Sequence, residues 1–114
     1  MKSIIITGAS SGIGHATAGM FLEKGWRVGL VARRADRLDA LAQGRPNAVV
    51  LPADVTDAGA MEAAFKRFGA VDVLFNNAGM FGPSAPIDEV ALDDWAQVLA
   101  VNLTGMFIAA RLAF

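Results

Sequence analysis

Three glycines near the amino terminus have the spacing of a loop that holds the phosphates of a dinucleotide. They belong to a segment between a strand-like apolar run and a helix-like pattern, Thr7-Gly8-Ala9-Ser10-Ser11-Gly12-Ile13-Gly14. Gly8 would let the chain leave the strand in a tight turn, Gly12 would let the backbone approach a pyrophosphate, and Gly14 would allow close packing of helix on strand. An ordinary glycine-rich turn is the alternative, which the strand–loop–helix context disfavours.

Other groups in this loop are suited to binding anions. Backbone N–H groups at the start of the following helix would point at the phosphates. The hydroxyls of Ser10 and Ser11 would add further donors. We therefore assign the following loop residues to cofactor binding: Gly8, Ser10, Ser11, Gly12, Ile13 and Gly14.

The end of the second expected strand indicates which dinucleotide the loop would hold. An acidic residue about 20 positions beyond the loop would bind the adenosine ribose of NAD, but the sequence has Ala32 there, followed by Arg33 and Arg34. Guanidinium groups suit a ribose 2′-phosphate, so NADP is favoured over NAD. Two alternatives stay open. The arginines can be a solvated pair at the start of a helix, and Asp36 can bind the adenosine ribose as in an NAD site.

Strand-like and helix-like segments alternate along the chain. This alternation predicts an α/β fold, a Rossmann-like doubly wound parallel sheet with helices on both faces. Four strands are expected, at Lys2–Thr7, Val28–Ala32, Ala48–Leu51 and Val71–Phe75. The first helix is expected to turn one apolar side inward, made of Ile13, Ala16, Thr17, Met20 and Phe21. Two more helices follow, over Asp36–Gln43 and after a cap at Thr56 or Asp57, the latter burying Met61, Ala64, Phe65 and Phe68.

A long amphipathic helix is expected at the end of the chain. Its apolar side carries Leu92, Trp95, Leu99, Leu103, Met106 and Ala110. The most apolar stretch, Val98–Phe114, contains polar residues and is shorter than a helix that spans a bilayer. We therefore expect a buried helix and no membrane partner.

Several motifs together resemble the short-chain dehydrogenase/reductase family, in its simple form. The glycine spacing of Thr7–Gly14 is the first, and Asn76–Gly79, with the sequence Asn-Asn-Ala-Gly, resembles the family's sheet-stabilising motif. Asp54–Val55 resembles its adenine-contacting pair, and Val101–Asn102 resembles the segment with its active-site asparagine. The resemblance extends from about Ile4 to Ala110.

The resemblance implies an oxidoreductase that transfers a hydride between NAD(P)(H) and a small alcohol or carbonyl substrate. It implies further cofactor contacts at Asp54, Val55, Asn77, Ala78 and Gly79, and a catalytic role for Asn102 through a helix distortion and a bound water. From the residues alone, Asp54 can equally be a turn residue, and Asn76 is expected to be mainly structural. An unpaired Asn102 amide on an apolar helix side would cost roughly 1 to 3 kcal/mol, so it should have a partner.

The rest of the family's catalytic set is missing from these 114 residues. The chain has no tyrosine, its last lysine is Lys66, and Ser84 lies in a loop. Family members run to about twice this length, so we expect residues 1–114 to form a single dinucleotide-binding domain, the amino-terminal half of a longer enzyme, inactive alone. The alternative is a non-catalytic nucleotide-binding or sensor protein; a nucleotide-sugar epimerase is disfavoured by the loop spacing.

Composition narrows the possible partners. The net charge is -1, with 10 basic and 11 acidic residues spread along the chain, so no nucleic acid partner is expected. The absence of cysteine fits a reducing, cytoplasmic compartment, and no ligand cluster accompanies the single histidine, so no metal is assigned. A truncated sheet would leave one edge of the fourth strand unpaired, which predicts a homo-oligomer.

Overall fold

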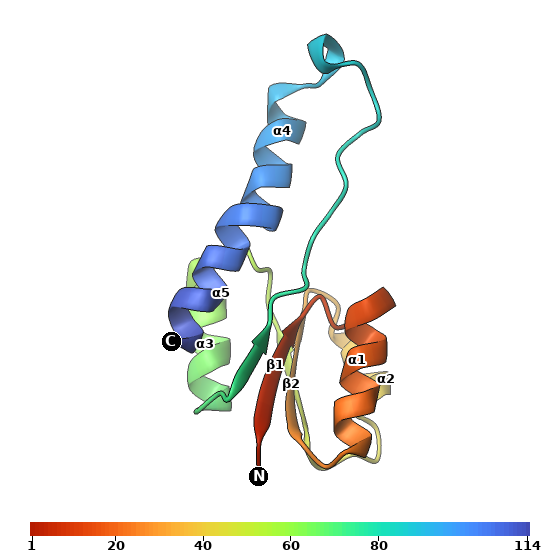
Figure 1. Cartoon of the computed structure of the whole chain (residues 1–114), viewed down its shortest axis with the longest axis vertical. Coiled ribbons are helices and arrows are strands. Elements are labelled where there is room, and N and C mark those ends of the chain that lie inside the picture. The colour runs from red at the N-terminus through yellow and green to blue at the C-terminus, as the bar shows by residue number, and fades with distance from the viewer.

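The computed structural model describes residues 1–114 and contains one sheet of four parallel strands (Figure 1). The strands are ordered β3-β2-β1-β4 and comprise β1 (Ser3–Thr7), β2 (Arg27–Ala32), β3 (Ala48–Pro52) and β4 (Val73–Phe75). The helices are α1 (Gly12–Glu23), α2 (Ala35–Ala42), α3 (Ala58–Phe68), the 3-10 turn η1 (Ile87–Glu89), α4 (Leu92–Leu99), the π-helical turn η2 (Ala100–Thr104) and α5 (Gly105–Ala113). The predicted Rossmann-like α/β fold is confirmed, although β4 begins two residues later than expected.

The central strand β1 explains why helices cover both faces of the sheet. All five of its residues are buried, and successive side chains point to opposite faces. Ile4 and Ile6 pack with apolar residues of α1 and α2, whereas Ile5 packs with those of α3 and α5. A strand buried on both sides needs a continuous apolar run, and the three isoleucines provide it.

Helix α3 follows its sequence signals closely. The Asp57 side chain accepts a hydrogen bond from the Ala60 N–H at 3.1 Å, so Asp57 is the N-cap. The four residues expected inward, Met61, Ala64, Phe65 and Phe68, are all buried.

The predicted inward face of α1 was mostly wrong, since Phe21 is the one of its apolar residues that packs against the core. The residues buried along this helix are Gly14, Ala18 and Leu22, whereas Ile13 is 72% exposed and Met20 is 50% exposed. Gly14 and Ala18 are small enough to let the helix lie close to the sheet. This line of contact, with a spacing of four residues, places the bulkier apolar side chains outside.

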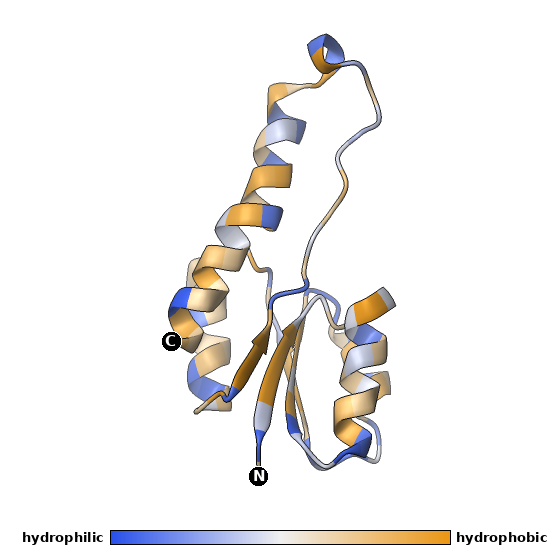
Figure 2. Cartoon of the chain, in the orientation of Figure 1, coloured by the Kyte–Doolittle hydropathy of each residue, from blue (hydrophilic) through white to orange (hydrophobic).

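The long helix expected at the end of the chain is present, but the expectation that it is buried was wrong. Residues Leu92–Ala113 form one continuous helix of 22 residues, with a mean hydropathy of 1.4 and 11% of its most apolar window buried, long and apolar enough to cross a bilayer by length and composition alone. Leu92 is 84% exposed, and apolar bands follow the projecting helix in Figure 2.

Only the carboxyl-terminal half of this helix is attached to the sheet. Gly105 and Ala109 are buried, and Asn76 Nδ2 donates a hydrogen bond to the Met106 carbonyl oxygen at 2.8 Å. The second contact gives Asn76 the structural role expected of it. The amino-terminal part, α4, has no buried residue and rises away from the sheet (Figure 1).

Candidate dinucleotide-binding site

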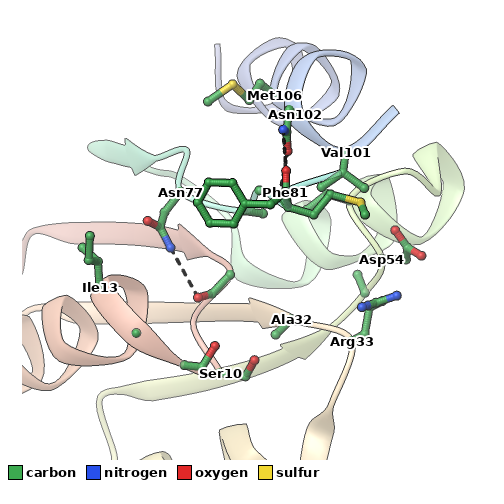
Figure 3. A pocket seen from close by; sticks show the side chains of 18 of the residues that line it. Ser10, Ile13, Ala32, Arg33, Asp54, Asn77, Phe81, Val101, Asn102 and Met106 are labelled. Atoms are coloured by element: carbon green, nitrogen blue, oxygen red, sulfur yellow. Dashed lines mark hydrogen bonds between the residues drawn. The ribbon is translucent and has the colours of Figure 1, made fainter. Parts of the chain in front are cut away.

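A cleft of about 970 Å³ opens where the four parallel strands end (Figure 3). Its floor contains residues within two positions of the strand ends, among them Gly8, Arg33, Ala53 and Asn77. Its other wall comes from the loop after β4 and from the long helix. Ligands of doubly wound folds bind at this edge of the sheet, so the cleft is the candidate site.

The glycine loop has the geometry that its sequence indicates. Gly8 and Gly12 have φ angles of +66° and +60°, a left-handed conformation that other residues rarely adopt. A Cβ on Gly12 would meet no atom within 4 Å, which leaves its backbone open to a ligand in the cleft. Gly14 does not line the cleft: it lies beneath the loop, where a Cβ would collide with the Gly8 carbonyl oxygen.

The loop after β4 is tied to the glycine loop through Thr7. The Thr7 hydroxyl oxygen accepts hydrogen bonds from the N–H groups of Asn77 and Ala78, both at 3.0 Å. In return, Asn77 Nδ2 donates to the carbonyl oxygens of Thr7 at 3.2 Å and Gly8 at 3.4 Å. This network fixes one side of the cleft relative to the other.

Arg33 and Asp54 form the charged end of the cleft (Figure 3). The Asp54 carboxylate oxygen Oδ1 accepts hydrogen bonds from the Thr56 N–H at 2.9 Å and the Thr56 hydroxyl at 2.7 Å. These bonds, backbone first and then side chain, lower the pKa of Asp54 below its usual 3.8, and the positive charge of Arg33 acts in the same direction. Asp54 therefore has the turn role considered for it and also presents a charged acceptor to the cleft.

Arg34 does not join this end of the cleft. Its guanidinium lies 3.3 Å from the Asp36 carboxylate, and the two side chains are 60% and 69% exposed. The hydrogen bond from Arg34 lowers the pKa of Asp36. Of the residues considered around the 2′-hydroxyl position, only Ala32 and Arg33 line the cleft.

Asn102 lies in the π-helical turn, on the wall that faces the glycine loop. Its Oδ1 accepts from the Met80 N–H at 2.7 Å, and its Nδ2 donates to the Met80 carbonyl oxygen at 2.8 Å. The backbone of Met80 is thus the partner that an amide in this position was expected to need. The helix distortion implied by the family resemblance is present, and π-turns are frequent at functional sites.

Comparison with known proteins identifies the family. A family model described as short chain dehydrogenase matches residues 2–114. The chain belongs to this family. It is 46% identical over 104 residues to "Probable NADP-dependent dehydrogenase in aabA 3'region" of Dichelobacter nodosus, covering 87% of this chain and 98% of that protein.

Longer relatives share the same region. Serine 3-dehydrogenase of Agrobacterium fabrum is 43% identical over 109 residues, covering 91% of this chain and 44% of the relative. The closed form of serine dehydrogenase complexed with NADP+ superposes with a TM-score of 0.93 at 26% identity, covering 98% of this chain and 47% of that structure. The chain thus spans about half the length of these two relatives.

The cleft collects most of the residues singled out from sequence. Gly14 and Arg34 are the two cofactor-binding candidates that stay outside it. Those that line it are Gly8, Ser10, Ser11, Gly12, Ile13, Arg33, Asp54, Val55, Asn77, Ala78, Gly79 and Asn102.

Sequence patterns missed several residues of the site. Thr7 carried one signal, a hydroxyl in an otherwise apolar strand. Met80 and Phe81, in a loop that could border the substrate, line the cleft. Gln97 and Met106 line it too, and they were not expected there because a helical pattern of 3.6 residues per turn does not show a π-turn.

Proposed function

We propose that this chain binds NADP in the cleft and forms the cofactor-binding part of an oxidoreductase acting on a small alcohol or carbonyl compound. The observation that carries the proposal is the meeting of the glycine loop, Arg33 and Asn102 in one cleft. Membership of the family and the NADP named for two of the related proteins support it.

The donors in the cleft fit the parts of such a cofactor. The open backbone at Gly12, the hydroxyls of Ser10 and Ser11 and the N-terminus of α1 would hold the pyrophosphate. Arg33 would bind the 2′-phosphate, and the Asp54 carboxylate would accept a hydrogen bond from the adenine amino group. When bound, the nicotinamide would give or take the hydride.

Asn102 would act by position, since both polar groups of its amide are engaged with the Met80 backbone. It would hold the loop after β4 against the π-turn, beside the reacting groups. The family's tyrosine has no counterpart, because the chain contains none, and no lysine follows Asn102. We therefore propose that residues 1–114 alone do not turn over substrate.

Titration with NADPH tests the proposed function directly. A saturable rise in NADPH fluorescence is expected, with NADH bound about 30-fold more weakly because it lacks the phosphate that a charged donor recognises. Incubation with NADPH and a panel of carbonyl compounds should give no oxidation at 340 nm. Absence of saturable NADPH binding would contradict the cofactor proposal, and turnover would contradict the proposed inactivity.

The missing tyrosine also favours a second candidate, a nucleotide-binding or sensor protein without catalysis. Both candidates predict NADPH binding, so the titration does not separate them. They differ in the expected size of the native protein. An intact mass and a reading frame limited to these 114 residues would favour the sensor. A longer product carrying a tyrosine and a lysine four residues apart would favour the enzyme.

We also propose that two copies associate through the exposed side of α4 and α5. Leu92, Leu103 and Phe107 are 84%, 63% and 64% exposed, so an apolar stripe lies open to solvent. An antiparallel pair of these helices would bring Asp93 near the amino end of one copy toward Arg111 near the carboxyl end of the other.

Light scattering after size-exclusion chromatography should therefore show a dimer. The double variant Leu103→Glu/Phe107→Glu is expected to be monomeric, because four buried charges would face each other across the pair. Met20→Glu, at a 50% exposed position on α1, is the matched control and should remain a dimer. A monomeric wild-type chain would refute this assembly.

A further inference from the structure

The wall of the cleft that faces the glycine loop contains no ionisable side chain. It consists of Met80 and Phe81 from the loop after β4, and of the helix residues Gln97, Val101, Asn102 and Met106. The charged residues of the cleft, Arg33 and Asp54, lie on the side of Val101, away from Phe81 (Figure 3). A group bound beside Phe81 would therefore meet apolar surface and neutral amides only.

Phe81 is an exposed aromatic ring on a fixed piece of backbone. Its side chain is 99% exposed, although it lines the cleft. On one side, the Met80 backbone is held by both polar atoms of the Asn102 amide. On the other side, Gly82 lies so close to α4 that a Cβ there would be 3.1 Å from Val98 Cγ2. Because the backbone on both sides of Phe81 is held, the chain would lose little entropy when the ring contacts a ligand.

Gln97 is the one side-chain amide of the cleft that has both its oxygen and its nitrogen free to bind a ligand. The Asn102 amide is engaged with Met80, and Asn77 Nδ2 donates to two carbonyl oxygens of the glycine loop. The Gln97 side chain makes no hydrogen bond within the protein, and Gln97 is exposed. It precedes Asn102 by five residues, and the wider π-turn brings the two to the same wall.

Building on the proposed function, we propose that Phe81 and Gln97 contact the substrate and select an uncharged, largely apolar alcohol or carbonyl compound over an amino-acid-like zwitterion. The Phe81 ring would cover the apolar part of the substrate, and the Gln97 amide would pair with one neutral polar group. An ammonium or carboxylate group placed against this wall would lose water without gaining an opposite charge.

The test measures binding of two probes to the chain saturated with NADP+, followed by ligand-observed NMR. Cyclohexanol represents the uncharged apolar class, and L-serine represents the zwitterion. Cyclohexanol should bind, whereas serine should show no saturable binding. Phe81→Ala is expected to weaken cyclohexanol binding about fivefold, as for loss of an aromatic contact. Gln97→Leu is expected to weaken it about threefold, as for one neutral hydrogen bond.

Phe114→Ala is the matched control, because Phe114 is 97% exposed and lies outside the cleft. This variant should bind both cyclohexanol and NADPH like the wild type. Cyclohexanol binding that is absent or independent of Phe81, or equal binding of serine, with NADPH binding intact, overturns this inference alone. A wild-type chain that does not bind NADPH contradicts the proposed function and this inference with it.

Discussion

Gly14→Ala is expected to abolish NADPH binding and to lower the free energy of unfolding by about 3 kcal/mol, the upper range for overpacking. A Cβ at this position would collide with the Gly8 carbonyl oxygen and lie 2.6 Å from Nδ2 of Asn77. Neither neighbour can move freely, because Asn77 Nδ2 holds the carbonyl oxygens of Thr7 and Gly8 together. Helix α1 must therefore leave the strand, or the glycine loop must change shape. Urea unfolding and NADPH titration measure the two effects.

Gly59→Ala provides the matched control for this prediction. Gly59 also lies in the first turn of a helix, α3, but a Cβ there would meet only Asp57 Oδ1 at 3.6 Å, an ordinary contact. Alanine should stabilise this helix by up to about 1 kcal/mol through its higher helix propensity. NADPH binding should be unchanged. A Gly14→Ala chain that unfolds and binds NADPH like the wild type would disprove the close packing of α1 on the loop.

The sequence predicted well those parts of the fold that depend on residues close together in the chain or on the alternation of strand-like and helix-like segments. The alternation of strand-like and helix-like segments predicted the first strand and helices on both faces of the sheet, and Ile4, Ile5 and Ile6 pack accordingly. Asp57 and the four apolar residues after it defined α3 and its inward face. The glycine spacing predicted the loop because each glycine is needed for a steric reason that involves only residues close to it in the sequence.

The errors came from contacts that sequence spacing does not contain. On α1, the small residues Gly14 and Ala18 face the sheet in place of larger apolar ones, because they let the helix axis lie closer to the sheet. On α4 and α5, the same apolar period suits a core, a partner surface or a bilayer, so it could not predict that Leu103 would be 63% exposed. Within the site, the π-turn at Asn102 changed the register that would have identified Gln97.

Arg33→Ala is expected to weaken NADPH binding about 30-fold, and NADH binding by no more than about twofold. Loss of a hydrogen bond to a charged group costs about 2 kcal/mol, and each 1.4 kcal/mol changes a dissociation constant tenfold. The effect should be specific to NADPH because Arg33 lines the end of the cleft assigned to the 2′-phosphate. Fluorescence titrations of both nucleotides with the wild type and the variant measure the change in discrimination.

Removing Arg33 also changes the electrostatic surroundings of Asp54. The comparison of NADPH with NADH binding in this variant depends on Asp54 keeping its charge. Arg33 is the smallest of the causes that lower the pKa of Asp54, after the two Thr56 hydrogen bonds. Those bonds remain in the variant, so Asp54 stays ionised at neutral pH and its expected adenine contact is kept for both nucleotides. Arg34→Ala, which removes only the exposed pair with Asp36, should leave NADPH affinity within about twofold. If Arg33→Ala preserves the preference for NADPH, the 2′-phosphate is recognised by another group and the assignment of Arg33 fails.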